Sequence, residues 1–151
     1  LIKVETAEEM FKATQNNLPT DIAIFSAAVA DFKISKKSQD KIKKQESLTI
    51  NLEKNIDILN FVSNHNSMRP KLVIGFAAET KDLDKNALYK LSNKNCDWII
   101  ANDVSKRNCG FESDYNEVTI HYDKNRKEKL SHKKKSEISE EIVDRIVNQM
   151  N

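Results

Sequence analysis

The chain has 151 residues, of which 38% are hydrophobic and 32% are charged, and its formal net charge is only +2. This length predicts a single domain with its own core, and the small net charge argues against a dedicated nucleic-acid-binding protein. No apolar run approaches the ~18 residues that cross a bilayer, and no signal peptide is visible. Two cysteines, Cys96 and Cys109, are too few for a disulfide framework, which predicts a cytoplasmic protein.

The first part of the chain predicts a strand, a helix and a second strand. Residues 1–6, LIKVET, have the pattern of a strand, so we expect an N-terminal part of the domain to be missing. Thr6 and Glu9 have the spacing of a capping box, which predicts a helix over residues 7–17. Residues 21–30, DIAIFSAAVA, form a nearly continuous apolar run, as is typical of a parallel strand buried on both faces.

The tract that follows is rich in lysine. Six lysines and one acidic residue lie between Lys33 and Lys44. A tract of this kind at a strand end could hold phosphates, or it could be an ordinary solvated loop. Because it is polar and has few apolar anchors, we expect a mobile flap over about residues 34–46. Residues 47–53, SLTINLE, then alternate in the manner of a strand.

The rest of the chain alternates helices and strands. Asn55 is expected to cap a short helix, and residues 71–78 predict a second buried strand. Thr80 is expected to cap the next helix, in which apolar residues recur at helical spacing. The remaining predicted elements are a buried strand over 97–101, a hairpin of 117–122 and 128–132, and a helix over 136–150. The inward residues of that last helix are expected to be Ile138, Ile142, Val143, Ile146, Val147 and Met150.

Strands that alternate with helices predict an α/β fold. We expect a Rossmann-like three-layer domain with a mostly parallel sheet and a C-terminal antiparallel hairpin. Only two glycines occur, so the sequence contains neither a G-x-G-x-x-G motif nor a P-loop. Any bound phosphate must therefore be held by groups other than a glycine-rich loop.

Polar residues end three of the predicted strands, and the carboxyl ends of parallel strands meet at one edge of a sheet. Asp31 at such an end could hold Mg²⁺ through its oxygens. Asp31, Thr80 and Asn102 are equally ordinary caps of helices and turns. Phe76, which follows the glycine of the second buried strand, is either a core residue or the floor of a pocket for a base.

A pair of lysines and the three histidines are two further sets of candidates. Lys90 and Lys94 share one helix face, which matters only if that face is turned toward the crevice at the sheet edge. His65, His121 and His132 have no spacing suited to a metal site or a catalytic triad. We expect the three histidines to lie on the surface.

Six motifs occur in order along the chain: AAVADFK, KIKK, LEKNIDIL, IGFAAET, WIIANDV and GFESDYNEVTIH. In order and spacing they resemble the phosphopantothenate–cysteine ligase domain, over residues 4–146. In many bacteria that domain is the C-terminal half of a bifunctional coenzyme A biosynthesis flavoprotein. The resemblance implies an enzyme that joins 4′-phosphopantothenate to cysteine with CTP, through an acyl-cytidylate and with release of pyrophosphate.

The resemblance also implies roles for individual residues. Asp31 is the implied ligand of Mg²⁺, and Lys90 and Lys94 match lysines that reach the triphosphate. Lys41 matches the catalytic lysine of a mobile flap over the active site. Ile56 stands where the family has a proline, in a KNPD-type segment. The full set of implied nucleotide-binding residues is Ser26, Ala27, Ala28, Asp31, Lys54, Asn55, Ile56, Asp57, Phe76, Lys90 and Lys94.

The same resemblance implies a homodimer, fused to or associated with a phosphopantothenoylcysteine decarboxylase. FMN is expected only if that decarboxylase domain precedes the chain. The glycine-rich N-terminal segment of the family has no match here. Two other interpretations stay open: a non-catalytic nucleotide-binding module of the same fold, and an RNA-binding or interaction domain that uses the lysine tracts. The small net charge and the lack of RNP-type aromatic residues weigh against the RNA-binding interpretation.

Overall fold

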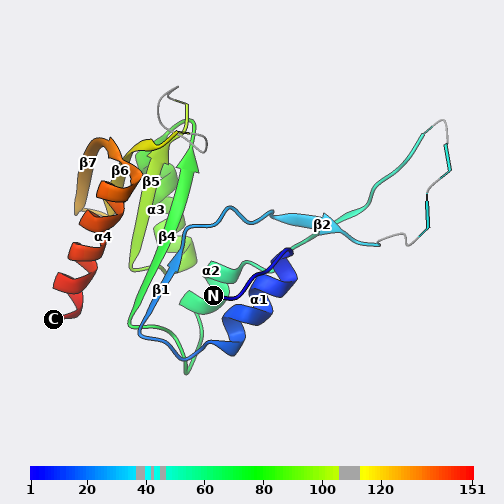
Figure 1. Ribbon diagram of the computed structural model, residues 1–151, viewed down its shortest axis with the longest axis horizontal. Coiled ribbons are helices and arrows are strands. Elements are labelled where there is room, and N and C mark those ends of the chain that lie inside the picture. Colours follow the sequence, from blue (N-terminus) through cyan, green and yellow to red (C-terminus); the bar gives the residue numbers. More distant parts are fainter. Residues whose placement is uncertain (37–39, 42, 45–46, 106–112) are drawn as a thin grey trace.

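The computed structural model describes residues 1–36, 40–41, 43–44, 47–105 and 113–151. A five-stranded sheet of order β1-β4-β5-β6-β7 forms its centre, and a separate ribbon of β2 and β3 projects from it (Figure 1). The strands are β1 (Ile22–Phe25), β2 (Phe32–Ile34), β3 (Leu52–Lys54), β4 (Leu72–Glu79), β5 (Trp98–Asp103), β6 (Tyr115–His121) and β7 (Lys127–Lys134). The helices are α1 (Ala7–Asn16), α2 (Ile58–Ser63), α3 (Leu83–Lys94) and α4 (Lys135–Met150).

Three neighbouring strands, β1, β4 and β5, run parallel, and β6 and β7 add an antiparallel hairpin at one side. The central strands β4 and β5 are the most deeply buried, because helices cover both of their faces. This arrangement confirms the expected Rossmann-like α/β fold. No helix within the described ranges is both long and apolar enough to cross a membrane.

Two apolar clusters lie on opposite faces of the sheet. One packs β4, β5, β6 and β7 against α4, through Ile74, Ile100, Ile120 and Ile142 among others. The other packs β4 and β5 against α3, around Ala87. The alternation of side chains along each strand sends successive residues to different clusters. The domain therefore has three layers, with α3 on one side of the sheet and α4 on the other.

The N-terminal part of the prediction was wrong in two places. Residues 1–5 form no strand; Ile2 and Val4 instead line an apolar groove beside α1 and β1. The predicted strand over 21–30 ends at Phe25, and β1 lies at an edge of the sheet, so Ile24 remains 48% exposed. An apolar run alone does not distinguish a central strand from an edge strand, because the sequence does not show which neighbours the strand has.

Two predicted helix caps were also wrong. The side chain that caps α2 is that of Asp57, which accepts a hydrogen bond from the Asn60 amide, and not that of Asn55. The residue at the start of α3 is Asp82, with a left-handed φ of 49° and no capping bond, and not Thr80. The capping box of Thr6 and Glu9 is confirmed.

The later part of the chain needs two corrections. His121 is 1% exposed and lies on β6 between the sheet and α3. The prediction that it lies on the surface was wrong. In α4 the buried residues are Ile138, Ile142 and Ile146. Val143, Val147 and Met150 are partly exposed, so the apolar face of the helix is narrower than predicted. The sequence marks the apolar residues, but the contact with the sheet covers only one stripe of them.

The segment predicted as a strand over 47–53 is mostly irregular. Only its end belongs to β3, which pairs antiparallel with β2, a strand that the sequence did not indicate. Within the flap expected over 34–46, residues 37–39, 42 and 45–46 lie outside the described residues, as does Cys109.

Arg69 joins four elements at the amino-terminal edge of the parallel strands. Its guanidinium donates to the Ser63 carbonyl at 2.8 Å and to the Asn95 carbonyl at 3.0 Å, which are at the ends of α2 and α3. It also donates to Asp97, just before β5, at 3.1 Å. Asp97 in turn accepts from the Val73 amide of β4 at 2.6 Å. The two helices are therefore held in place relative to the two central strands.

We predict that Arg69→Met destabilises the fold by about 2 kcal/mol, because a partly buried carboxylate and several carbonyls lose their donor. Urea denaturation followed by circular dichroism measures the free energy of unfolding. Lys71→Met is the matched control: its ion pair with Asp21 is about three-quarters exposed and contributes ~0.5 kcal/mol or less. Equal, small losses in the two variants would contradict the role given to Arg69.

Candidate functional site

A cavity of about 610 Å³ lies at the carboxyl ends of β1 and β4, between the sheet, α2 and α3. This is the edge at which open parallel sheets bind ligands. Ala27, Asp31, Asn55, Phe76 and Lys90 all line it, although they come from four separate parts of the chain. The other residues from the predicted set that border the cavity are Ser26, Ile56, Asp57 and Lys94.

The loop after β1 forms one wall of the cavity, and Asn55 holds it. The Asn55 amide donates to the Asp31 carbonyl at 2.8 Å, and its side chain donates to the Ala30 carbonyl at 2.7 Å. The two bonds tie the stretch after β1 to the stretch after β3. Small side chains, such as Ala27 and Ala30, leave this backbone open to close approach by a ligand.

The floor of the cavity depends on a glycine. A Cβ on Gly75 of β4 would lie 2.7 Å from Leu59 Cδ2 and 2.8 Å from Ile99 Cδ1. Both of these side chains line the cavity. Gly75 thus allows α2 to lie close to the sheet. Phe76, the next residue, packs against the apolar cluster under α4 and also borders the cavity, so it is in part a core residue.

Both lysines of the cavity are already paired with carboxylates. Lys90 Nζ lies 2.8 Å from Glu79 Oε1, at the end of β4. Lys94 forms an ion pair with Asp57, the residue that caps α2. The two ammonium groups are therefore held at fixed places along one face of α3, as their spacing predicted.

Asp31 is the one acid in this set whose carboxylate has no hydrogen bond or ion pair with another described residue. Mg²⁺ in nucleotide sites is commonly held by one or two carboxylates together with substrate phosphates. Asp31 fits that requirement. Across the described ranges, no group of three or more His, Cys, Asp or Glu side chains could form an all-protein metal site.

Three predicted residues do not border the cavity: Ala28, Lys54 and Lys41. Ala28 and Lys54 lie next to residues that do, whereas Lys41 belongs to the long segment between β2 and β3. The ribbon of β2 and β3, which flanks that segment, projects from the sheet in Figure 1. Two cavity-related residues were missed by the sequence analysis. Tyr89 lines the cavity and is 68% exposed, and Glu79 holds Lys90. The sequence did offer one signal for Tyr89: it is an aromatic residue directly before a lysine that was already a candidate.

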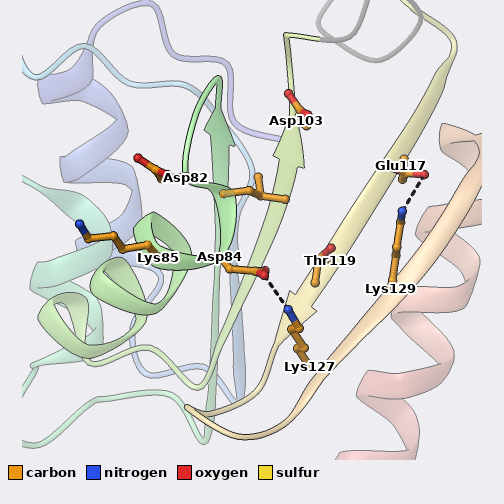
Figure 2. Close-up of a pocket in the computed structure, with 9 residues that line it drawn as sticks. Asp82, Asp84, Lys85, Asp103, Glu117, Thr119, Lys127 and Lys129 are labelled. Atoms are coloured by element: carbon orange, nitrogen blue, oxygen red, sulfur yellow. Dashed lines mark hydrogen bonds and ion pairs between the residues drawn. The ribbon is translucent and has the colours of Figure 1, made fainter.

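A second cavity, of about 670 Å³, lies beside the start of α3 and the strands β6 and β7 (Figure 2). Its walls carry alternating charges: Lys127 Nζ lies 2.6 Å from Asp84, and Lys129 Nζ lies 3.2 Å from Glu117. The hydrogen bond from Lys127 lowers the pKa of Asp84. Burial lowers the pKa of His121, whose Nε2 lies 3.3 Å from Asp84. Asp103 at the end of β5 borders this cavity, but its other strand residues come from the antiparallel strands β6 and β7. The first cavity lies at the carboxyl ends of two parallel strands and gathers most of the predicted residues, so it is the candidate site.

The chain is similar to known proteins over almost its whole length. The coenzyme A biosynthesis bifunctional protein CoaBC of Haemophilus influenzae is 39% identical over 148 residues, which are 97% of this chain and 36% of that protein. The CoaBC protein of Bacillus subtilis is 37% identical over 147 residues, 96% of this chain and 36% of the relative. The chain thus spans about a third of the length of these curated relatives.

Solved structures agree with this result. A crystal structure of the C-terminal domain of CoaBC matches with a TM-score of 0.74 and 30% identity, over 99% of this chain and 65% of that one. A DNA/pantothenate metabolism flavoprotein from Streptococcus pneumoniae has the same fold, with a TM-score of 0.72 and 21% identity over 99% of this chain and 70% of that one. The family model of the DNA/pantothenate metabolism flavoprotein C-terminal domain matches residues 1–150. The resemblance stated from the motifs is confirmed, and the chain belongs to this family.

Proposed function

We propose that the chain is the nucleotide-binding and catalytic part of a cytoplasmic, CTP-dependent phosphopantothenate–cysteine ligase in coenzyme A biosynthesis. The observation that carries the proposal is one cavity that brings together Asp31, Asn55, Phe76, Lys90 and Lys94. The names of the relatives, which are coenzyme A biosynthesis proteins, support the pathway. Their description as bifunctional supports fusion to or association with a decarboxylase domain, which would be the domain that uses FMN.

The proposed reaction has two steps. The carboxylate of 4′-phosphopantothenate attacks the α-phosphorus of CTP, which forms an acyl-cytidylate and releases pyrophosphate. The amine of cysteine then attacks the acyl carbon, which forms the amide and releases CMP. Neither step needs a covalent bond to the protein. The protein contributes positioning and the stabilisation of charge in an in-line displacement.

Each group of the cavity has a task in this scheme. Lys90 and Lys94 bind triphosphate oxygens through charge-assisted hydrogen bonds. Bound Mg²⁺ would neutralise phosphate charge, and Asp31 is the residue that would hold it. Asn55 keeps the loop after β1 in place, so that its backbone can approach the nucleotide. Phe76 offers an apolar surface at the edge of the base.

A non-catalytic nucleotide-binding module is the second candidate. It is favoured by one observation: Lys41, the lysine assigned to catalysis, does not border the cavity in the described structure. The two candidates differ in single-turnover chemistry. A ligase releases pyrophosphate from CTP when 4′-phosphopantothenate is present and cysteine is absent, whereas a binding module takes up CTP without releasing pyrophosphate.

We predict that Asp31→Asn in the intact protein slows pyrophosphate release about 10²-fold, because the metal-bound phosphates lose their protein carboxylate. Rapid-quench measurement with CTP and 4′-phosphopantothenate tests this. Asp82→Asn is the matched control, since Asp82 borders the other cavity and asparagine tolerates its left-handed backbone. A wild-type protein that binds CTP but releases no pyrophosphate would establish the binding module.

We predict that Lys41→Gln lowers turnover about 10²–10³-fold while CTP affinity falls only modestly. A lysine placed on the reacting oxygens of a closed, dry site acts far more strongly than a charge in water. Lys43→Gln and Lys44→Gln are the controls, and each should change turnover less than about tenfold. Steady-state and single-turnover kinetics of the three variants provide the measurement. Equal, small effects would show that the tract is a solvated loop.

We also propose a homodimer in which a second copy covers the ribbon of β2 and β3. Phe32, Ile34, Leu48, Ile50 and Leu52 are each about half exposed on this ribbon and its approach. A two-stranded ribbon is marginally stable alone in water, and a row of exposed apolar side chains marks an interaction surface. In the dimer, the apolar row of one ribbon would pack against the same row of the second copy.

If a second copy covers the ribbon, Ile34→Glu should convert the dimer to a monomer, because it places a charge opposite Leu52 in the apolar row. Sedimentation velocity of the intact protein measures the change. Val143→Glu, on the exposed face of α4, is the control and should leave the dimer unchanged. A wild-type monomer, or a dimer that survives Ile34→Glu, would contradict the ribbon as the interface.

A further inference from the structure

Glu79 forms an ion pair with Lys90 and holds its ammonium group. Glu79 is the last residue of β4, and its side chain is only 14% exposed. One carboxylate oxygen lies 2.8 Å from Lys90 Nζ, and the other accepts a hydrogen bond from Asn86 Nδ2 at 3.0 Å. The same Asn86 nitrogen donates to the Lys81 carbonyl at 2.9 Å. The carboxylate is thus bound on both of its oxygens.

Asn86 and Lys90 are four residues apart on α3, so they lie on one face of the helix, one turn from each other. Glu79 fits between this face and the end of β4. Its backbone is fixed as well, because its carbonyl accepts from the Val104 amide at 3.0 Å. Strand, helix and the loop after β5 therefore determine where the carboxylate lies.

The two lysine partners of the candidate site differ in position. Asp57, the partner of Lys94, itself lines the cavity, whereas Glu79 does not border it. Lys90 does line the cavity. Of these two residues, a ligand in the cavity therefore contacts Lys90, and Glu79 acts on the ligand through the lysine that it holds and through its negative charge.

We infer that Glu79, anchored by Asn86, is a positioning residue that holds the Lys90 ammonium toward the triphosphate of the bound nucleotide; this inference rests on the proposed function. A free lysine side chain has many rotamers, and ordering it on binding costs affinity. An ammonium that is already held by a carboxylate from behind avoids most of that cost. Lys90 keeps two further protons for phosphate oxygens while it donates one to Glu79.

The sign of the effect separates positioning from bulk charge. Removal of a negative charge near a polyanion site, considered alone, strengthens binding of the polyanion. Loss of positioning weakens it. We expect Glu79→Gln to weaken CTP binding about three- to tenfold, the cost of ordering one long side chain. Asn86→Ala should weaken it less, since the ion pair itself survives.

The experiment is isothermal titration of the intact protein with CTP and with CMP. Glu79→Gln is compared in the wild-type background and in a Lys90→Met background. We expect weaker CTP binding in the first background, no further loss in the second, and unchanged CMP binding in both, because CMP lacks the outer phosphates. Steady-state kinetics should show a raised KM for CTP with kcat within about twofold, as loss of ground-state binding does.

The matched control is Glu117→Gln, which removes one carboxylate from a lysine pair in the other cavity and should leave CTP affinity unchanged. Tighter CTP binding by Glu79→Gln would overturn the positioning role, and so would an equal loss of CTP affinity in the Lys90→Met background. In either case, CTP binding by the wild-type protein would leave the proposed function intact. A wild-type protein that does not bind CTP would overturn the proposed function and this inference with it. A lowered melting temperature together with equal losses for CTP and CMP would show a merely structural role.

Discussion

The hydrogen bonds of Arg69 are the constraint on which the rest of the domain depends. They lie at the amino-terminal edge of β4 and β5, opposite the candidate site, and they fix the ends of α2 and α3 to those strands. Because a helix is nearly rigid, fixing its far end also fixes its near end. Asp57 at the start of α2 and Lys94 at the end of α3 form an ion pair, so the two helices are joined to each other as well as to the sheet. The cavity is thus bounded by parts that share one framework.

Within that framework, side-chain size decides how much room remains. Gly75 lets α2 approach the sheet, and the small side chains of the alanines after β1 leave room on the other wall of the cavity. A larger residue at Gly75 would displace Leu59 and Ile99, and both of them line the cavity. The space at the sheet edge is therefore a product of the packing and not of a dedicated glycine-rich loop. This explains how a chain with only two glycines can form a cavity of about 610 Å³.

The sequence predicted what depends on local pattern. The α/β order, the capping box at Thr6 and the shared face of Lys90 and Lys94 follow from spacing along a single element. Two local predictions, the helix caps at Asn55 and Thr80, were wrong. The other failures depend on contacts between distant elements. The burial of His121 requires α3 to cover β6, and the pairing of β2 with β3 joins stretches about twenty residues apart. Glu79 was not predicted for the same reason, since its role depends on its contacts with Asn86 and Lys90 and not on its neighbours in the chain.

The charged residues that line the cavity balance one another. Asp31 and Asp57 cancel Lys90 and Lys94, so these lining residues give no net positive charge. A triphosphate carries several negative charges, and a neutral site does not compensate them. If the proposed nucleotide binds here, a cation bound with it and a part of the protein outside the cavity would supply the missing charge. The lysine tract between Lys33 and Lys44 carries a local excess of positive charge, with six lysines and one acid. In the proposed ligase, a neutral cavity would bind the polyanion fully only when the lysines of this tract reach it. A lid that excludes water during the reaction acts in this way.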